Sequence, residues 1–212
     1  MEVRTVGPAV ITEDTDRLAV EALEQWTALV GAEHVIADDR SRKTAETATF
    51  ATTQRVPAIL RPGSRDEVQE CMRIANRFRI PVYPISSGKN WGYGSRVPVT
   101  DASVLIDLSR LNRILDFNEK LAYVTVEPGV TQRQLFQLLQ DRHSSLWMDA
   151  TGSSPDCSLI GNAVERGIGG RAINKQCKAL RLFQPTYTSF REHCHAEYVR
   201  LMAVSGKFRH TK

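Results

Sequence analysis

Residues 56–85 carry the pattern that most strongly constrains the fold of this chain. They contain a short apolar run, a helical stretch and a second apolar run, at residues 56–60, 64–78 and 80–85. Ser64 and Glu67 predict a capping box at the start of the helix, because a hydroxyl accepts from the third amide while the carboxylate reaches back. The pattern therefore predicts a strand–helix–strand unit.

The rest of the chain adds helices and antiparallel strands to this unit. An amphipathic helix is predicted over residues 12–30, followed by a polar surface connection at 37–53. Thr131 is expected to cap a later helix. Three more strands are predicted, at residues 103–108, 113–117 and 123–127, and a hairpin turn at 118–120 joins the last two. The body of the chain is therefore α+β.

Charge divides the chain into two unequal parts. Of the 28 Lys and Arg and 24 Asp and Glu residues, nine basic and two acidic residues fall in residues 171–212, which leaves 19 basic and 22 acidic in residues 1–170. Such asymmetry marks either a nucleic-acid or membrane arm, or a segment of different origin. The basic charges are scattered and form no known nucleic-acid motif. We therefore expect neither nucleic acid nor membrane as a partner.

The cysteines and the first residues exclude several classes of protein. The four cysteines are widely spaced, which predicts buried, inert thiols instead of a disulfide framework. The segment His193–His195 has no second ligand pair, so no metal site is expected. No secretory signal and no apolar stretch of membrane length is visible. A cytoplasmic location is the resulting expectation.

The segment 86–95, directly after the second predicted strand, is rich in glycine. It holds Gly88, Gly92 and Gly94 together with hydroxyl side chains and Lys89. Glycine lets the backbone approach a ligand and adopt positive φ, and successive exposed amides bind anions. A diphosphate is the predicted ligand, although glycine content alone leaves an ordinary surface turn open. The spacing fits neither the P-loop nor the G-x-G-x-x-G pattern.

A second stretch rich in small residues, 151–158, leads into the segment 159–163. This stretch and the glycine-rich segment belong to a set of motifs that occur in a known order. The segments 85–95, 127–131, 146–149 and 161–167 resemble, in order and spacing, the flavoproteins of the vanillyl-alcohol oxidase and 4-cresol dehydrogenase family. The resemblance implies FAD and a two-subdomain PCMH-type FAD-binding fold, with a small strand–helix–strand subdomain and a mixed or antiparallel sheet subdomain.

The resemblance also implies which residues line the cofactor. The loop is expected to wrap the diphosphate, and the later segments to line the adenosine and the isoalloxazine. The implied residues are Pro84, Ile85, Ser86, Ser87, Gly88, Lys89, Asn90, Trp91, Gly92, Glu127, Gly129, Thr151, Gly152, Ser153, Ser158, Gly161 and Asn162. Asp156 or Ser158 is expected to approach flavin N5, and the resemblance does not decide between them.

Two residues carry specific expectations from the family. Tyr93 stands where the family places a tyrosine that hydrogen-bonds the phenol oxygen of the substrate, and a packed loop aromatic is the alternative. Asn90 stands where related flavoproteins carry a His bonded to flavin. We therefore expect FAD to bind without a covalent link, in an FAD-dependent oxidoreductase that takes hydride from para-substituted phenols.

The resemblance ends at Gly169. We therefore divide the chain into a helical lead-in (1–55), an FAD-binding domain (56–169) and a basic tail of unrelated sequence (170–212). A frameshift or a truncated gene would produce such a tail. The substrate half is then missing, so apolar surface around Trp91, Tyr93 and Ile160 is expected to be exposed. The alternatives are a non-catalytic flavin-binding fragment and, less well supported, a nucleic-acid binder; a homo-oligomer is left open.

Overall fold

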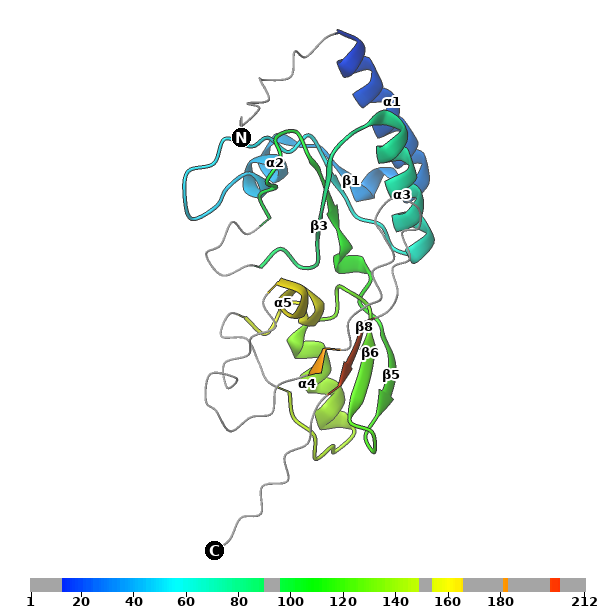
Figure 1. The fold of residues 1–212 in the computed structure, drawn as a ribbon, viewed down its shortest axis with the longest axis vertical. Helices are drawn as coiled ribbons and strands as arrows, with labels where there is room; N and C mark the ends of the chain where they lie inside the picture. Colours follow the sequence, from blue (N-terminus) through cyan, green and yellow to red (C-terminus); the bar gives the residue numbers. More distant parts are fainter. Residues whose placement is uncertain (1–12, 90–95, 149–153, 166–180, 183–198, 203–212) are drawn as a thin grey trace, which may run out of the picture.

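The computed structural model describes residues 13–89, 96–148, 154–165, 181–182 and 199–202. Two subdomains lie one above the other in Figure 1, and each is built on a four-stranded sheet. Helices and strands alternate in the first subdomain, whereas antiparallel strands dominate the second. The predicted α+β class is confirmed.

The first sheet has the strand order β1-β2-β4-β3. Its strands are β1 (Val35–Ile36), β2 (Ile59–Leu60), β4 (Val104–Asp107) and β3 (Val82–Ile85). The strands β2, β4 and β3 run parallel, and β1 is antiparallel to β2. Helix α3 (Arg65–Phe78) carries the chain from β2 back to the start of β3. The carboxyl ends of the three parallel strands therefore lie at one edge of the sheet.

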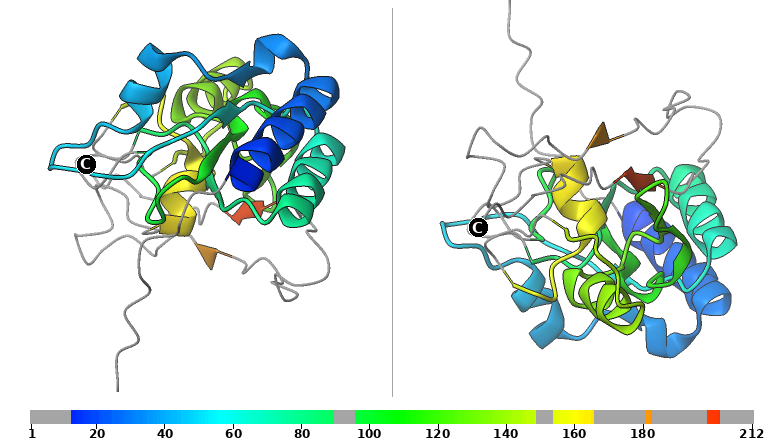
Figure 2. Two further views of the ribbon diagram at one scale, coloured as in Figure 1. Left: turned by 90° about the horizontal axis from the view of Figure 1, so that it is seen from above. Right: turned by 90° about the horizontal axis from the view of Figure 1, so that it is seen from below.

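Helices α1 (Glu13–Val30) and α3 lie side by side against this sheet (Figure 2). Trp26 is fully buried, and its indole N–H donates to the carbonyl oxygen of Cys71 across 3.2 Å. A buried Trp needs such a partner for its only polar atom. Leu60, Ile106 and the apolar face of α3 complete the core.

The cap of α3 differs in one detail from the prediction. The hydroxyl of Ser64 accepts from the Glu67 amide across 3.1 Å, as expected. The Glu67 carboxylate, however, accepts from the amide of Gly63 across 2.7 Å, one residue farther back than a standard capping box requires. The turn between β2 and α3 is fixed by this bond.

The second sheet has the order β5-β6-β8-β7 and is antiparallel throughout. Its strands are β5 (Ile114–Asn118), β6 (Tyr123–Val126), β8 (Val199–Met202) and β7 (Arg181–Leu182). The hairpin between β5 and β6 is confirmed, and the amide of Ala122 donates to the carbonyl of Glu119 in its turn. Two of the strands thus come from the part of the chain beyond residue 170.

Helices α4 (Gln132–Asp141) and α5 (Leu159–Glu165) lie beside the second sheet (Figure 1). Thr131 forms a complete capping box with Gln134 at the start of α4, which confirms the predicted cap. Leu135 and Leu139 from α4 pack with Val126 and Ile160 in the core. The expectation that Ile160 is exposed is wrong, because only 7% of its surface is accessible.

Several short elements were not predicted. Helix α2 (Asp39–Ala45) lies within the stretch read as a polar connection, and Asp38 caps it by accepting from the Ser41 amide. The single-turn helices η1 (Ala32–His34) and η2 (Leu108–Arg110) flank β1 and β4. Across the residues that the structure describes, no helix is both long and apolar enough to span a membrane.

Candidate functional site

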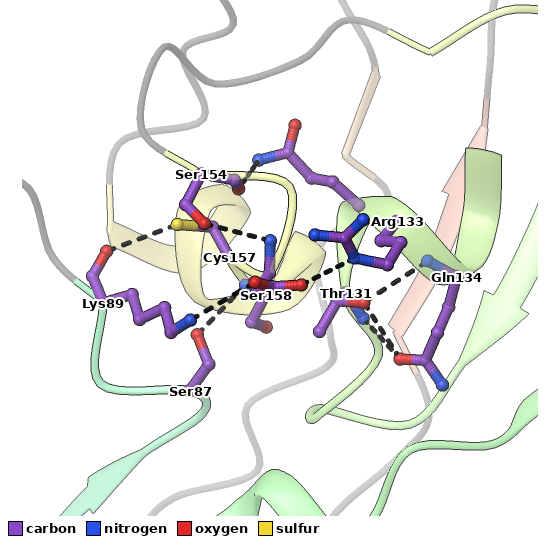
Figure 3. A network of polar contacts seen from close by, with 10 residues as sticks. Ser87, Lys89, Thr131, Arg133, Gln134, Ser154, Cys157 and Ser158 are labelled. Carbon is purple, nitrogen blue, oxygen red and sulfur yellow. Dashed lines mark hydrogen bonds and ion pairs between the residues drawn. The ribbon is translucent and has the colours of Figure 1, made fainter. Parts of the chain in front are cut away.

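The candidate site lies where the loop after β3 meets the turn before α5. The loop leaves the carboxyl edge of the parallel strands, which is where open α/β sheets bind their ligands. Figure 3 shows Ser87 and Lys89 of this loop facing Cys157 and Ser158 of the turn. The structure therefore brings together the two small-residue segments singled out in the sequence.

Ser158 ties three segments of the chain together. Its amide donates to Oγ of Ser87 across 3.2 Å. Its hydroxyl donates to the carbonyl of Pro128 across 2.7 Å and accepts from the Gly161 amide across 3.0 Å. Ser158 is buried. Because these bonds occupy its hydroxyl, the residue shapes the site through the backbone that it holds.

Gly161 sits against the beginning of the loop. A Cβ at this position would lie 3.3 Å from Oγ and 3.4 Å from Cβ of Ser86, closer than side chains ordinarily approach. The amide of Asn162, the next residue, donates to the carbonyl of Ser158 across 3.3 Å. The missing side chain at position 161 therefore allows α5 to approach the loop.

Two other predicted glycines are required by the backbone. Gly88 has a φ of 62°, in the left-handed region that favours glycine, and its ideal Cβ would meet Nε of Arg96 at 3.1 Å. A Cβ on Gly129 would lie 2.6 to 2.8 Å from three backbone carbonyl oxygens, those of Leu108, Ser109 and Leu111. Gly129 therefore serves close backbone packing, and Gly88 serves the turn of the loop.

Charged side chains flank the junction between loop and turn. The ammonium of Lys89 lies 3.6 Å from Oδ2 of Asp156, and Nε of Arg133 lies 2.8 Å from Oδ1 of the same carboxylate. The hydrogen bond from Arg133 is the largest influence that lowers the pKa of Asp156, and the charges of Arg133 and Lys89 act in the same direction. Asp156 therefore stays ionised between two cations.

Backbone bonds hold the turn to the start of α4. The amides of Gln132 and Arg133 donate to the carbonyls of Cys157 and Pro155 across 3.0 and 2.8 Å. Sγ of Cys157 lies 3.5 Å from the carbonyl of Lys89, to which it donates. The turn is thus fixed on one side by α4 and on the other by the loop.

The cysteines within the described residues are free and buried, as predicted. They are Cys71 and Cys157. Burial raises the pKa of the Cys71 thiol to about 12, with smaller contributions from Glu67 and Glu70. Cys71 therefore stays protonated at neutral pH. Cys177 and Cys194 lie outside the described residues.

Glu127 pairs with Arg113 at the open end of the β5–β6 hairpin. Its carboxylate accepts from the backbone amide of Arg113 across 2.8 Å and from the Arg113 guanidinium across 3.0 and 2.7 Å. The Glu127 side chain is 5% exposed, whereas that of Arg113 is 71% exposed. In this structure Glu127 therefore fixes the pairing of β5 with β6.

The remaining predicted residues divide into two groups. Pro84 lies in β3 opposite Ile106, and Ile85 is buried in the core with Leu105. The others lie outside the described residues; they are Asn90, Trp91, Gly92, Tyr93, Thr151, Gly152 and Ser153. Arg133 was missed by sequence reasoning, because nothing in the sequence links it to a turn 23 residues away.

The geometry suits a ligand that needs close contact with the backbone. The loop leaves the carboxyl ends of parallel strands, turns through a left-handed glycine, and meets a helix made approachable by a second glycine. Backbone amides in such loops suit phosphate oxygens. In the described part of the chain, no group of three or more His, Cys, Asp or Glu is placed to bind a metal ion.

Comparison with known proteins identifies the ligand class. The model of the family described as "FAD binding domain" matches residues 56–187. The chain belongs to this family. The predicted cofactor, FAD, is thereby confirmed, and the cradle at Gly88 and Gly161 fits a ligand with a diphosphate. The matched segment extends beyond residue 169, where the resemblance was expected to end.

The chain is similar to two characterised proteins. It is 56% identical over 148 residues to the 1'-carboxy-chondrochloren decarboxylase of Chondromyces crocatus. The aligned region covers 70% of this chain and 27% of that protein. It is 30% identical over 168 residues to the flavoprotein subunit of 4-cresol dehydrogenase [hydroxylating] of Pseudomonas putida, covering 74% of this chain and 32% of that protein.

A solved structure confirms the predicted two-subdomain fold. The crystal structure of p-cresol methylhydroxylase with substrate bound superposes with a TM-score of 0.70 and 27% identity, over 78% of this chain and 32% of that one. The chain thus spans about a third or less of the length of these relatives. It holds the FAD-binding domain of a flavin oxidoreductase family that includes cresol dehydrogenases.

Proposed function

We propose that the chain is the FAD-binding part of an enzyme that oxidises para-substituted phenols. The observation that carries the proposal is the junction of the loop at Ser86–Lys89 with the turn at Ser154–Ser158, at the carboxyl edge of the parallel strands. Its support from relatives is the similarity to a 4-cresol dehydrogenase subunit and to p-cresol methylhydroxylase.

The loop and the turn would hold the cofactor together. Ser86, Ser87, Gly88 and Lys89, continuing through Asn90, Trp91 and Gly92, would surround the diphosphate. Thr151 to Ser153, Ser158, Gly161 and Asn162 would lie along the rest of the cofactor, with Gly129 and Glu127 shaping the neighbouring turn. Because Asn90 replaces a His, we propose that FAD is bound without a covalent link.

FAD, when bound, accepts two electrons and a proton equivalent from substrate as hydride. The contribution of the chain is to position the substrate beside it. We propose that the hydroxyl of Tyr93 donates to the phenol oxygen, which stabilises the phenolate and favours loss of hydride from the carbon of the para substituent that is bonded to the ring, leaving a quinone methide. Positioning of this kind contributes much of the rate in such reactions.

The substrate proposal is tested with a chimera, because relatives need a second half that this chain does not cover. Residues 1–169 replace the matching part of the Pseudomonas putida flavoprotein subunit. We expect 4-methylphenol to bleach the bound flavin without oxygen, and Tyr93→Phe to slow the bleaching at unchanged flavin content. An FAD-loaded chimera that no para-alkyl phenol reduces would contradict the proposal.

A second candidate function is oxidative decarboxylation. The relative from Chondromyces crocatus is a decarboxylase by name, and its identity of 56% exceeds that of the cresol enzyme. A chimera with the remaining part of that decarboxylase distinguishes the two functions. Release of carbon dioxide from a carboxylated aromatic substrate, with no reduction of flavin by 4-methylphenol in the first chimera, would favour decarboxylation.

The division of the chain at residues 55 and 169 is likewise a proposal. Two observations bear on the second boundary. The FAD-binding family match reaches residue 187, and β8 pairs with β6 in the register Tyr123 to Met202. Cytoplasmic location and the absence of nucleic acid and membrane as partners stay predictions, and a homo-oligomeric state stays open.

A further inference from the structure

Within the described residues, Asp156 contacts both the loop after β3 and helix α4. It contacts Lys89 of the loop at 3.6 Å and Arg133 of the helix at 2.8 Å. Asp156 itself lies in the turn before α5, outside both the loop and α4. The contacts therefore connect two segments that are 44 residues apart through a third.

Arg133 anchors Asp156 on the side of the helix. Its side chain bonds to the carboxylate, and its amide bonds to the carbonyl of Pro155, the preceding residue of the turn. A residue held through both its side chain and its neighbouring backbone has few alternative positions. The carboxylate of Asp156 is thus presented to the loop from a fixed support.

Lys89 receives contacts from the turn at both its ends. Its ammonium faces Asp156, and its carbonyl accepts from Sγ of Cys157. It directly follows Gly88, which has positive φ. Glycine leaves the backbone of the loop free to adopt several conformations. The ion pair of the neighbouring Lys89 therefore helps to select one of them.

We propose that Asp156 is a positioning residue for FAD, which holds the loop at Ser86–Lys89 in its binding conformation through Lys89. This rests on the proposed function, because it assumes that the loop binds FAD. The ammonium of Lys89 is then used to fix the loop, while the backbone amides receive the diphosphate. Preorganisation of this kind raises affinity by lowering the entropic cost of binding.

The alternative role for Lys89 is direct contact with the diphosphate. The two roles predict opposite effects of neutralising Asp156. If Lys89 fixes the loop, loss of Asp156 weakens FAD binding. If Lys89 binds the diphosphate itself, loss of the neighbouring carboxylate leaves the affinity unchanged or raises it, because the ammonium is released and a repelling charge is removed.

The experiment is a double-variant cycle on the full chain, with FAD titrated by flavin fluorescence. We expect Asp156→Asn and Lys89→Gln each to weaken FAD binding by about two- to fivefold, the range for exposed ion pairs. The double variant should be no weaker than either single variant. Asp156→Glu, which keeps the charge, should recover part of the affinity.

Asp101→Asn is the matched control. Asp101 forms an exposed ion pair with Arg55 at 3.1 Å, a pair that includes none of Lys89, Arg133 and Asp156. Its loss should leave FAD affinity unchanged. In the chain without FAD, hydrogen exchange of the Ser158 amide should speed up in Asp156→Asn and stay at the parent rate in Asp101→Asn.

The outcomes separate this inference from the proposed function. Failure of the parent chain to bind FAD contradicts the proposed function. If the parent chain binds FAD and Asp156→Asn binds it equally or more tightly while Lys89→Gln binds it less, the positioning role alone is overturned. Additive losses in the double variant overturn it as well.

Discussion

The backbone amide of Ser158 donates a hydrogen bond to Oγ of Ser87 across 3.2 Å, although 71 residues separate the two along the chain. Ser87 lies in the loop after β3 of the first sheet, and Ser158 immediately precedes α5 of the second subdomain. The bond therefore links the two subdomains at the place where we propose that FAD binds.

Replacing Ser158 by Ala should lower both stability and FAD affinity. The variant loses one donor and one acceptor in a buried site, and leaves the carbonyl of Pro128 and the amide of Gly161 without their partner. Such losses cost about 1–3 kcal/mol. Urea denaturation measures the change. Ser145→Ala, on the exposed segment after α4, is the control and should change stability little. Equal stability of the two variants would contradict this role of Ser158.

Gly88→Val should abolish FAD binding with most secondary structure retained. The residue has positive φ and lies beside Arg96, so a β-branched side chain strains the loop and blocks the backbone. Gly31→Val is the matched control, because Gly31 also has positive φ, at 90°, but follows α1. Circular dichroism and FAD titration of both variants should separate strain from ligand binding. Loss of FAD binding in both variants, or in neither, would contradict the assignment of the loop at Gly88 as an FAD-binding loop.

Glu127→Gln should destabilise the chain, since the buried carboxylate accepts charge-assisted bonds from Arg113. We expect a loss of about 2 kcal/mol in the free energy of unfolding, typical of hydrogen bonds to charged groups. Glu70→Gln removes an exposed ion pair on α3 and should change stability by less than about 0.5 kcal/mol. A Glu127 variant as stable as the Glu70 variant would show that the bonds to Arg113 contribute nothing net.

Local signals made much of this fold predictable. Ser64 and Thr131 predict the start of their helices, because a capping hydroxyl accepts from an amide only three residues away. The elements that were missed, such as α2 and α5, have seven residues each and depend on packing with distant parts of the chain. Asp38 and Ser158 also accept from the amide three residues on, but a helix of seven residues is too short to add a clear apolar periodicity to such a cap.

The site was predictable in part for the same reason. Glycines and serines identified the loop and the turn, because backbone conformation depends on residue type. The contacts of Asp156 with Arg133 and Lys89 depend on how the subdomains meet, which no local pattern encodes. Glu127 was singled out by resemblance, and its contact with Arg113 became visible only in the folded chain.

Acid should destabilise the chain through carboxylates whose pKa values are lowered by folding. A hydrogen bond from Arg55 lowers the pKa of Asp101, and one from Arg133 lowers that of Asp156. A carboxyl with a depressed folded pKa contributes stability that is complete above its unfolded value, 3.8, and is lost as pH falls through the folded value. We therefore expect stability to fall below about pH 4.

The variant Asp101→Asn with Asp156→Asn checks this origin of the acid sensitivity. Urea denaturation across the acid range should show a flatter dependence on pH in the double variant than in the parent chain. Identical slopes would mean that these two carboxylates titrate alike in the folded and unfolded chain.

The most direct measurement is a titration of the purified chain with FAD, followed by acid precipitation of the complex. The account predicts saturable binding with one FAD per chain, quenching of flavin fluorescence, and a colourless pellet because no covalent link is present. Absence of binding would contradict the assignment of the loop and turn as an FAD site. A yellow pellet that retains flavin would contradict non-covalent binding.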